Sequence, residues 1–288
     1  MGDRLTETGT AKDDRLPVIE VGRWAEDKHK LVSLYDRLFS TGMKRKWDTR
    51  VYIDLYSGPG IVRFSDGRLM WGSPLLAMAV PDPFDVYIFC EREPSFAEAL
   101  KIRAESLFPH LKTKVISGDC NEGVEQICSA IPVPSKGRSV LSLCFLDPYD
   151  LSINFSTVQR IGRSYVDFLV LLALYMDANR NYSSYIEPIN RKIEKFLGMK
   201  DWRALWTAKG QRAANFPQFL AECYSKQMEG LGYLPVRTEK MKLVRSREKN
   251  LPLYRIALFS RHEQAYRFWD EVLKYSTRQQ TLDFPSEA

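Results

Sequence analysis

Apolar and polar positions follow two different periods along this chain, and the alternation between them defines the predicted elements. Short continuous apolar runs, rich in β-branched and aromatic residues, are typical of strands buried in a parallel sheet. Runs of this kind occupy 51–55, 85–90, 114–117, 139–146 and 166–174. Helical segments separate them, so the order of elements predicts a doubly wound α/β sheet with helices on both faces.

Helical spacing and strand alternation also predict the remaining elements. Helices are expected over 24–39, 95–108, 186–197, 202–209, 216–228 and 263–275, another begins at about Ser73, and two alternating strands lie at 241–244 and 254–260. An antiparallel hairpin at the end of a parallel sheet is unlike a dinucleotide dehydrogenase. We predict one domain over 16–275, with a helical insertion at about 180–232 between strands five and six. The remaining residues form an N-terminal tail over 1–15 and a C-terminal tail over 276–288. The N-terminal tail is polar and is expected to be flexible.

Composition narrows the class of protein without identifying a partner. The 288 residues are 44% hydrophobic and 12% aromatic, which suits a globular domain with a sizeable core. A net charge of +6 permits nucleic-acid binding and equally suits an ordinary basic enzyme. The sequence contains no signal peptide and no apolar run that could span a bilayer, so we expect a cytoplasmic protein.

The five cysteines predict thiols rather than a framework of bridges. They are Cys90, Cys120, Cys128, Cys144 and Cys223, they show no C-x-x-C spacing, and three lie in or beside predicted strands. This pattern favours reduced core thiols, with neither a metal site nor disulfides.

The first predicted strand ends in a glycine turn at 57–60, Ser-Gly-Pro-Gly, which indicates a nucleotide-type site. Arg63 stands where a dinucleotide loop would have its third glycine, and Pro59 lacks the N–H that a pyrophosphate would use. Asp54, just before the turn, would repel a diphosphate and attract the ammonium group of an amino-acid-like ligand. S-adenosylmethionine fits this preference.

Polar residues follow the next two strands at the same predicted edge. Glu91 closes the second strand, where an acid accepts hydrogen bonds from ribose hydroxyls. Its distance from the glycines fits once an extended loop before Ser73, the expected helix N-cap, is subtracted. After the third strand, Asp119 could reach an adenine amino group, or Asp119 or Asn121 could cap a helix.

The helix over 24–39 carries Lys28 and His29, either on a solvated face or over the mouth of the cofactor site. A basic connector around Trp47 follows, either solvated or in contact with phosphate. Its basic residues are Lys44, Arg45, Lys46 and Arg50. The sequence leaves the roles of His29 and His262 open.

Basic residues outnumber acidic ones between positions 180 and 215, where aromatic residues are interleaved with them. This interleaving is typical of nucleic-acid-binding surfaces, and equally of a helical lid with solvated charges and buried aromatics. The candidate nucleic-acid contacts are Arg180, Arg191, Lys192, Lys195 and Arg203. The aromatic residues are Tyr182, Tyr185, Trp202 and Trp206.

Five short segments, spread over nearly the whole chain, match a pattern known from one protein family. They are W-A-E-D-K-H (24–29), Y-S-G-P-G (56–60), G-S-P-L-L-A (72–77), F-L-D-P-Y (145–149) and L-F-S-R-H (258–262). Together they resemble the three-Cys-motif partner family of bacteria and phages, within the class I S-adenosylmethionine-dependent methyltransferases. The resemblance implies a Rossmann-like class I methyltransferase fold: a seven-stranded, mostly parallel sheet with an antiparallel final strand. It also implies a partner protein bearing a three-cysteine, radical-S-adenosylmethionine-like motif.

The resemblance further implies which residues bind the cofactor and act in catalysis. Expected cofactor contacts are Asp54, Tyr56, Ser57, Gly58, Gly60, Glu91, Asp119 and Cys120. Asp147-Pro148-Tyr149 resembles the D/N-P-P-Y/F motif of amino-methyltransferases that act on nucleobases, with one proline missing. In those enzymes the acid or amide and the following carbonyl accept hydrogen bonds from an exocyclic amine, and the aromatic ring stacks on the extruded base.

Three hypotheses about function follow, in order of preference. The first is a methyltransferase that modifies a base amine in nucleic acid, with DNA favoured over RNA. The second is a cofactor-binding or non-catalytic partner of the three-cysteine protein, and the third is a small-molecule methyltransferase. No metal and no membrane contact are expected.

Overall fold

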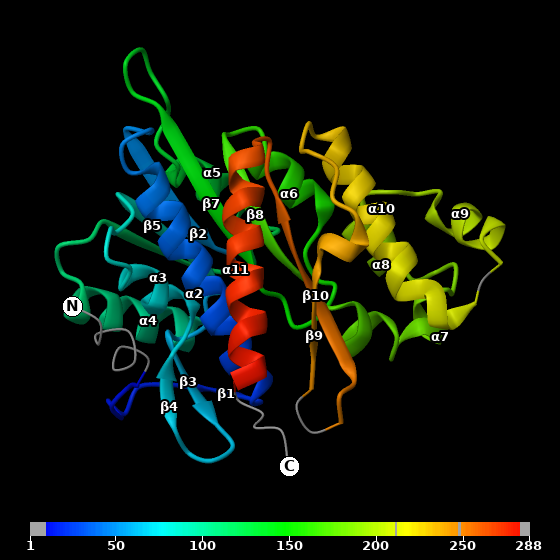
Figure 1. Cartoon of the computed structure of the whole chain (residues 1–288), viewed down its shortest axis with the longest axis horizontal. Helices are drawn as coiled ribbons and strands as arrows, with labels where there is room; N and C mark the ends of the chain where they lie inside the picture. The colour runs from blue at the N-terminus through cyan, green and yellow to red at the C-terminus, as the bar shows by residue number, and fades with distance from the viewer. Residues whose placement is uncertain (1–9, 211, 247–248, 283–288) are drawn as a thin grey trace.

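A seven-stranded sheet forms the centre of the computed structural model, which describes residues 10–210, 212–246 and 249–282, with side chains as far as Tyr275 (Figure 1). In spatial order its strands are β6 (Thr113–Ser117), β5 (Val86–Glu91), β2 (Thr49–Asp54), β7 (Val140–Leu146), β8 (Val166–Leu172), β10 (Pro252–Phe259) and β9 (Lys242–Arg245). Each strand lies where the sequence pattern predicts one.

The first five strands are parallel, and their carboxyl ends meet at one edge of the sheet. Every residue of β2, β7 and β8 is buried, which explains the continuous apolar runs. Asp54, the last residue of β2, is in register with Phe89 of β5 and Phe145 of β7. The segments that follow these three strands therefore start side by side.

The last two strands complete the predicted topology. β10 lies between β8 and β9 and is antiparallel to both. The seven-stranded, mostly parallel sheet with an antiparallel final strand is therefore confirmed. The chain has the Rossmann-like fold expected from the methyltransferase resemblance.

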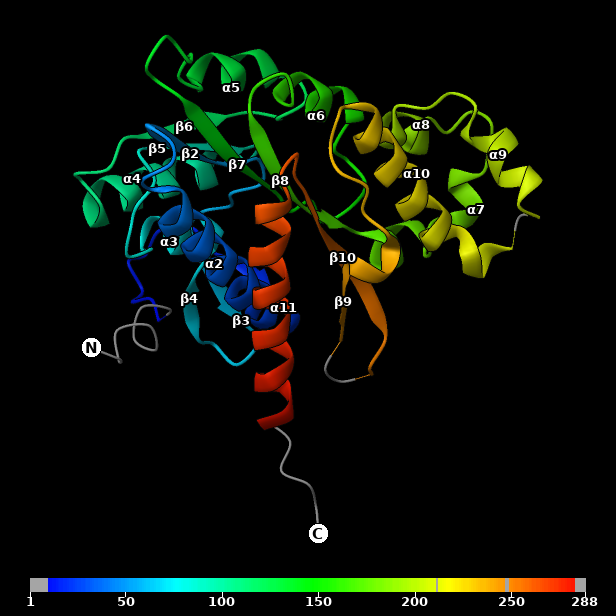
Figure 2. The ribbon, with the colours of Figure 1, turned by 45° about the horizontal axis from the view of Figure 1, so that its top comes forward.

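Helices cover both faces of the sheet (Figure 2). One face carries α2 (Trp24–Met43), α3 (Ser73–Met78) and α11 (Glu263–Leu282), and the other carries α5 (Val124–Ala130), α6 (Phe155–Ile161) and α10 (Phe216–Gly230). Tyr254 of β10 contacts Trp24 of α2, whereas Phe259 of the same strand contacts Tyr224 of α10. Residues an odd number apart on a strand point to opposite faces, so β10 joins both helical layers to the sheet.

A second, three-stranded sheet lies beside the first. It consists of β1 (Ile19–Val21), β3 (Ile61–Phe64) and β4 (Leu69–Trp71), with β3 parallel to β1 and antiparallel to β4. The extended loop predicted before Ser73 is therefore wrong, because most of it is this hairpin. Val62 and Phe64 pack against Ala25 of α2, an alternation too short to recognise in the sequence.

The helical insertion between β8 and β9 is confirmed, but one of its helices is shorter than predicted. In place of a helix over 186–197, the chain forms α7 (Tyr182–Tyr185) and α8 (Lys192–Leu197). Pro188 lies between them and disfavours a continuous helix through this segment. Two further helices precede β9, α9 (Trp202–Ala208) and α10, both close to the predicted ranges.

Structure extends into both predicted tails. The carboxylate of Asp14 pairs with Arg103 of α4 (Pro94–Leu107), and the N–H of Ala11 donates to Leu69 O, so residues 10–15 pack on the domain. The closing helix α11 continues past its predicted end at Tyr275 to Leu282. Residues 1–9 and 283–288 lie outside the described residues. Within the part that the structure describes, none of the helices has the length and apolarity needed to span a bilayer.

Candidate functional site

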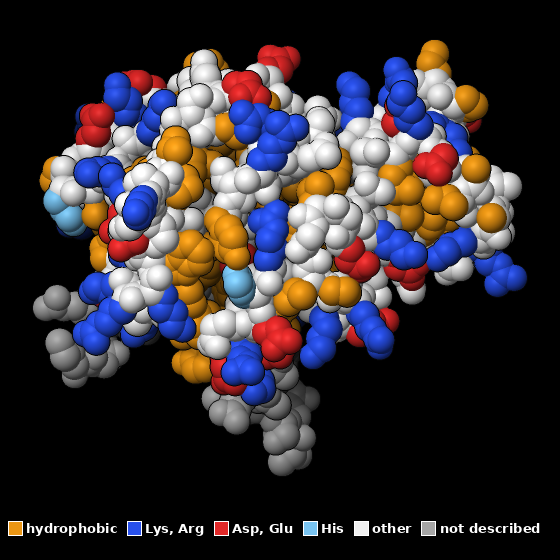
Figure 3. Space-filling model, turned by 90° about the horizontal axis from the view of Figure 1, so that it is seen from above, with side chains coloured by type: hydrophobic (Ala, Val, Ile, Leu, Met, Phe, Trp, Pro, Cys, Tyr) orange, Lys and Arg blue, Asp and Glu red, His pale blue; other side chains and the backbone are white. Residues whose placement is uncertain are grey.

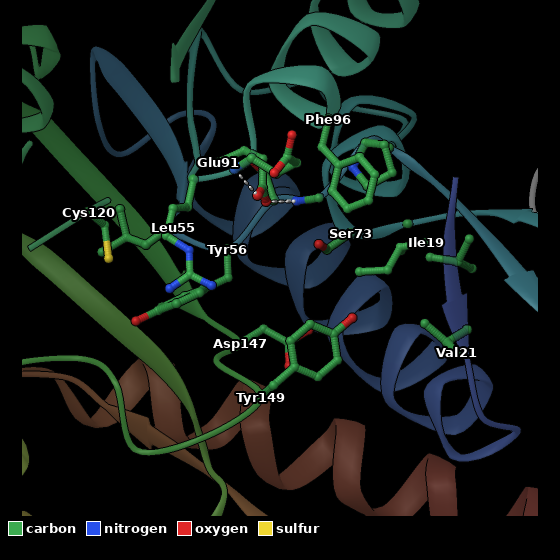
Figure 4. Close-up of a pocket in the computed structure, with 18 of the residues that line it drawn as sticks. Ile19, Val21, Leu55, Tyr56, Ser73, Glu91, Phe96, Cys120, Asp147 and Tyr149 are labelled. Atoms are coloured by element: carbon green, nitrogen blue, oxygen red, sulfur yellow. Dashed lines mark hydrogen bonds between the residues drawn. The ribbon is translucent and has the colours of Figure 1, made fainter. Parts of the chain in front are cut away.

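A cavity of about 340 Å³ opens at the carboxyl edge of the parallel strands (Figure 4). Residues that follow β2, β5, β6 and β7 line it, and β1 and α2 close it from the side. In Figure 4, Glu91 and Phe96 lie across the cavity from Asp147 and Tyr149. Of the residues predicted to bind a cofactor or to act in catalysis, it brings together Tyr56, Ser57, Gly58, Gly60, Glu91, Asp119, Cys120, Asp147 and Tyr149.

The glycine turn after β2 forms part of the cavity wall. Gly58 and Gly60 have φ angles of 59° and 85°, a region that disfavours other residues. A Cβ at Gly60 would lie 3.0 Å from Leu100 Cδ1, so the turn is also tightly packed. Buried Arg103 donates to Pro59 O at 2.6 Å and holds the turn from behind. The residue pattern did not single out this support, because Arg103 is one charged residue within the helix predicted over 95–108.

Asp54 lies beneath the cavity and is fully buried. Its Oδ2 accepts a hydrogen bond from Ser73 Oγ at 2.7 Å, and its Oδ1 accepts one from the Tyr56 N–H at 3.1 Å. Burial raises the pKa of Asp54 to about 7. Asp54 thus links β2 to α3. Ser73, expected as the N-cap, is instead the first residue of α3, and Gly72 takes the cap position.

Glu91 connects the end of β5 to the glycine turn. Its Oε2 accepts a hydrogen bond from the Gly58 N–H at 2.8 Å, and its Oε1 accepts one from the Glu93 N–H at 2.8 Å. The two bonds fix the carboxylate on the cavity wall (Figure 4). A ligand hydroxyl can still donate to it, because each carboxylate oxygen accepts more than one hydrogen bond.

The segment after β6 contributes Gly118, Asp119 and Cys120 to the cavity. Neither Asp119 nor Asn121 caps α5, since Gly123 occupies the N-cap position and no side chain caps it. Asp119 Oδ1 accepts the Asn121 N–H at 2.8 Å, which shapes a local turn. Asn121 Nδ2 donates to Ser152 O at 3.0 Å and ties this turn to the segment after β7.

The Asp-Pro-Tyr segment follows β7. Asp147 lines the cavity with 13% of its side chain exposed, and its Oδ2 forms an ion pair with Lys28 Nζ. Burial raises the pKa of Asp147, and the Lys28 ammonium opposes that rise. Pro148 is buried behind the cavity wall, whereas Tyr149 is 54% exposed at the cavity mouth. This leaves an aromatic ring accessible beside a paired carboxylate.

Lys28 and His29 belong to this cavity, so the interpretation of α2 as solvated at these positions is wrong. Both residues are buried and line the cavity, with Lys28 5% and His29 6% exposed. Burial lowers the pKa of His29 well below its ordinary value, which keeps the imidazole neutral at pH 7. Of the two interpretations, the structure supports the one in which this helix lies against the cavity; that a cofactor binds there stays a prediction.

Three of the candidate nucleic-acid contacts, Arg191, Lys192 and Lys195, line one depression together with Asp119 and Asn121, whereas Arg203 is held within the insertion. Arg203 donates to the carbonyl oxygens of Ile186 and Glu187 and lies 4.4 Å from the centre of the Trp202 ring. Arg191 pairs with Glu194, and Lys192 pairs with Asp150. Trp202, Trp206 and Tyr185 are buried, and Tyr182 contacts Trp206. On the face seen in Figure 3, Lys and Arg side chains are dispersed among acidic and apolar ones.

The basic connector and His262 lie at the opposite edge of the sheet from the cavity. Arg50 is buried and donates to Ser40 O and Pro83 O, so it acts within the fold. Trp47 packs on Tyr165, whose hydroxyl is 2.7 Å from His262 Nε2. His262 is therefore distant from the cavity residues and has a local structural partner.

The cysteines are free thiols, four of them buried. Cys120 lines the cavity, where burial raises its pKa to about 11. Among the described side chains, no group of three or more His, Cys, Asp or Glu residues is arranged to hold a metal ion.

Neither protein-family models nor curated protein sequences match this chain. Among solved structures it is similar to an O-methyltransferase from Bacillus cereus in complex with SAH, at 9% identity and a TM-score of 0.46, over 85% of this chain and 84% of that one. It is also similar to the O-methyltransferase TomG from Streptomyces achromogenes in complex with SAM, at 14% identity and a TM-score of 0.45, over 89% and 94% of the two chains.

A third similar structure is protein LPL1258 from Legionella pneumophila, at 17% identity and a TM-score of 0.41, over 61% of this chain and 75% of that one. All three TM-scores lie below 0.5, so the fold assignment rests on the strand order and register of this chain itself. By that criterion the chain has a Rossmann-like class I methyltransferase fold.

Proposed function

We propose that this chain binds S-adenosylmethionine in the cavity and transfers its methyl group. The observation that carries the proposal is one cavity in which the glycine turn, Glu91 and the Asp-Pro-Tyr segment meet at the carboxyl edge of a doubly wound sheet. Ligands of such sheets bind outside this edge. The bound cofactor would supply an electrophilic methyl group on a sulfonium centre.

The residues present fit this cofactor. A side chain at Gly60 would crowd the packed turn, and this turn leaves backbone exposed to the cavity beside it. Glu91 would accept hydrogen bonds from the ribose hydroxyls, and Asp119 with Cys120 would border the adenine. Asp54 would act on the amino-acid end indirectly, through its hydrogen bond with the Tyr56 N–H in the cavity wall.

We propose an exocyclic amine of a nucleic-acid base as the methyl acceptor, with DNA favoured over RNA. Two features support it: Asp147 offers a carboxylate oxygen at the cavity, and Tyr149 offers an exposed ring on which an extruded base could stack. Accepting protons from an aryl amine localises its lone pair for attack on the methyl group. Of the five candidate backbone contacts, Arg180 and Lys195 have neither an ion pair nor a side-chain hydrogen bond among the described residues, whereas Arg191 and Lys192 are ion-paired and Arg203 donates to backbone carbonyls.

Calorimetric titration with S-adenosylmethionine, and separately with S-adenosylhomocysteine, tests the first step. Binding by the wild type that is lost in Glu91→Ala and kept in Glu98→Ala would support the site, because Glu98 is exposed on the same segment of chain. Transfer of labelled methyl groups to single- and double-stranded DNA, RNA and free nucleosides then tests the acceptor. No binding to the wild-type chain would contradict the proposal of an independent enzyme.

A second candidate is a cofactor-binding partner of a three-cysteine protein, without activity of its own. The observation that favours it is the departure of Asp147-Pro148-Tyr149 from the D/N-P-P-Y/F motif by one proline. Cofactor binding, a stable complex on co-purification and no methyl transfer by the isolated chain would support this candidate. Methyl transfer that is indifferent to salt and to DNA would instead indicate a small-molecule acceptor, because phosphate contacts weaken with salt.

A further inference from the structure

Lys28 is a buried lysine whose side-chain nitrogen has two partners, a carboxylate and an aromatic ring. It lies on α2, 5% exposed, with its ammonium group paired with Asp147 Oδ2 and 5.1 Å from the centre of the Trp24 ring. Burying an unpaired ammonium group is costly, whereas a carboxylate and an aromatic face each favour the charged form. The contact joins α2 to the segment after β7, 119 residues further along the chain.

Arg92 lines the same cavity but forms no ion pair with Asp147 among the described residues, and the titratable neighbours of Asp147 other than Lys28 carry no positive charge. Three titratable groups interact electrostatically with Asp147: the carboxyl group of Asp54 on β2, and the phenol groups of Tyr149 and of Tyr254 on β10. His29, next to Lys28, is buried and neutral at pH 7. Lys28 is thus the cation that balances Asp147 among the described groups around it.

We infer that Lys28 is a positioning residue for methyl transfer: its ammonium group holds Oδ2 and keeps Asp147 ionised, which leaves Oδ1 to accept an N–H from the acceptor amine. This inference rests on the proposed function. The hydrogen bonds among described residues engage only Oδ2 of this carboxylate, and Asp147 lines the cavity. The Asp147 carboxylate has two acceptor oxygens: Lys28 occupies Oδ2, and Oδ1 is left for the substrate.

Of the two protonation states of Asp147, the ionised form is the better hydrogen-bond acceptor for an amine. A neutral carboxylic acid presents a donor as well as an acceptor, so it binds a doubly donating aryl amine less well than a carboxylate does. Burial alone would favour the neutral acid, because transfer from water disfavours the charged form. An ammonium group within hydrogen-bonding distance reverses part of that penalty.

The test is a pH titration of the Asp147 carboxyl group by carbon NMR of the full chain, without cofactor or acceptor. The signal is assigned as the one missing in Asp147→Asn. In Lys28→Met, we expect the titration midpoint of Asp147 to rise by about 1–3 pH units. In Lys28→Arg the charge is restored and the midpoint returns toward the wild-type value. Lys30→Met, which removes an exposed charge from the same helix, should leave it unchanged.

Circular dichroism establishes that each variant is folded, and Lys28→Gln replaces Lys28→Met if the latter is not. An unchanged Asp147 midpoint in the folded Lys28 variant would overturn the inference. So would a methyl group found on Lys28 by mass spectrometry after incubation with S-adenosylmethionine, since Lys28 would then be an acceptor. Because the titration needs no turnover, a shifted midpoint without any methyl transfer would count against the proposed function only.

Discussion

The carboxyl edge of the sheet and the helical insertion both carry charged and aromatic residues, but they use them differently. At the edge, Glu91, Asp147 and Tyr149 line one cavity because parallel strands end side by side. In the insertion, Arg203 donates to backbone carbonyls and Trp202 is buried. Strand topology therefore determines where a polar residue faces more reliably than a basic and aromatic composition does.

The largest expected effect concerns the buried acid at this edge. Asp54 has a pKa raised to about 7, so the unfolded chain releases its proton at lower pH than the folded chain does. Wild-type stability should therefore fall as pH rises from about 4 to about 7, and Asp54→Asn should remove up to about 4 kcal/mol of that fall. Urea unfolding at several pH values measures it. Asp66→Asn, in the exposed turn of the β3–β4 hairpin, is the control; an equal change there would contradict the prediction.

Asp147→Ala should reduce methyl transfer by about 100-fold or more, because it removes the carboxylate that we propose accepts hydrogen bonds from the substrate amine. Cofactor affinity should change little, since the expected ribose contact, Glu91, is untouched. Single-turnover transfer and calorimetry separate the two quantities. Unaltered transfer would show that the Asp-Pro-Tyr segment does not act on the acceptor.

Arg203→Ala should weaken the insertion rather than a nucleic-acid contact. It removes hydrogen bonds to the carbonyls of Ile186 and Glu187, so the free energy of unfolding should fall by about 2 kcal/mol. DNA affinity, if the chain binds DNA, should be unchanged in the folded variant. Lys195→Ala makes the converse comparison, with stability kept and affinity reduced. A loss of DNA affinity in folded Arg203→Ala would restore Arg203 as a polymer contact.

The smallest effect compares two glycines with nearly the same φ angle. Gly60 and Gly67 have φ angles of 85° and 84°. A Cβ at Gly60 would contact the side chains of Leu100 and Leu75, whereas a Cβ at Gly67 would have no heavy atom within 4 Å. Gly60→Ala should lower cofactor affinity about tenfold more than Gly67→Ala, because both carry the conformational cost and only Gly60 shapes the cavity. Equal affinities would place the cofactor away from the turn.

Sequence patterns predicted the seven strands, the inserted antiparallel strand and nine of the residues that line the cavity. They did not predict the β3–β4 hairpin, whose alternation spans only a few residues. They also left Lys28 and His29 undecided between a solvated face and the cavity. A helical face is solvated or buried according to what packs on it, and here β1 and the segment after β7 do so.

The sequence by itself determined which segments form the strands and which polar residues follow them. Continuous apolar runs and the glycine turn have local causes, in burial and in backbone conformation. Only the tertiary structure decided which charges meet. Lys28 and Asp147 pair across 119 positions, Arg103 supports the turn at Pro59, and Arg203 holds its own helical insertion. Such pairings depend on distances between elements packed together, which residue spacing along the chain does not encode.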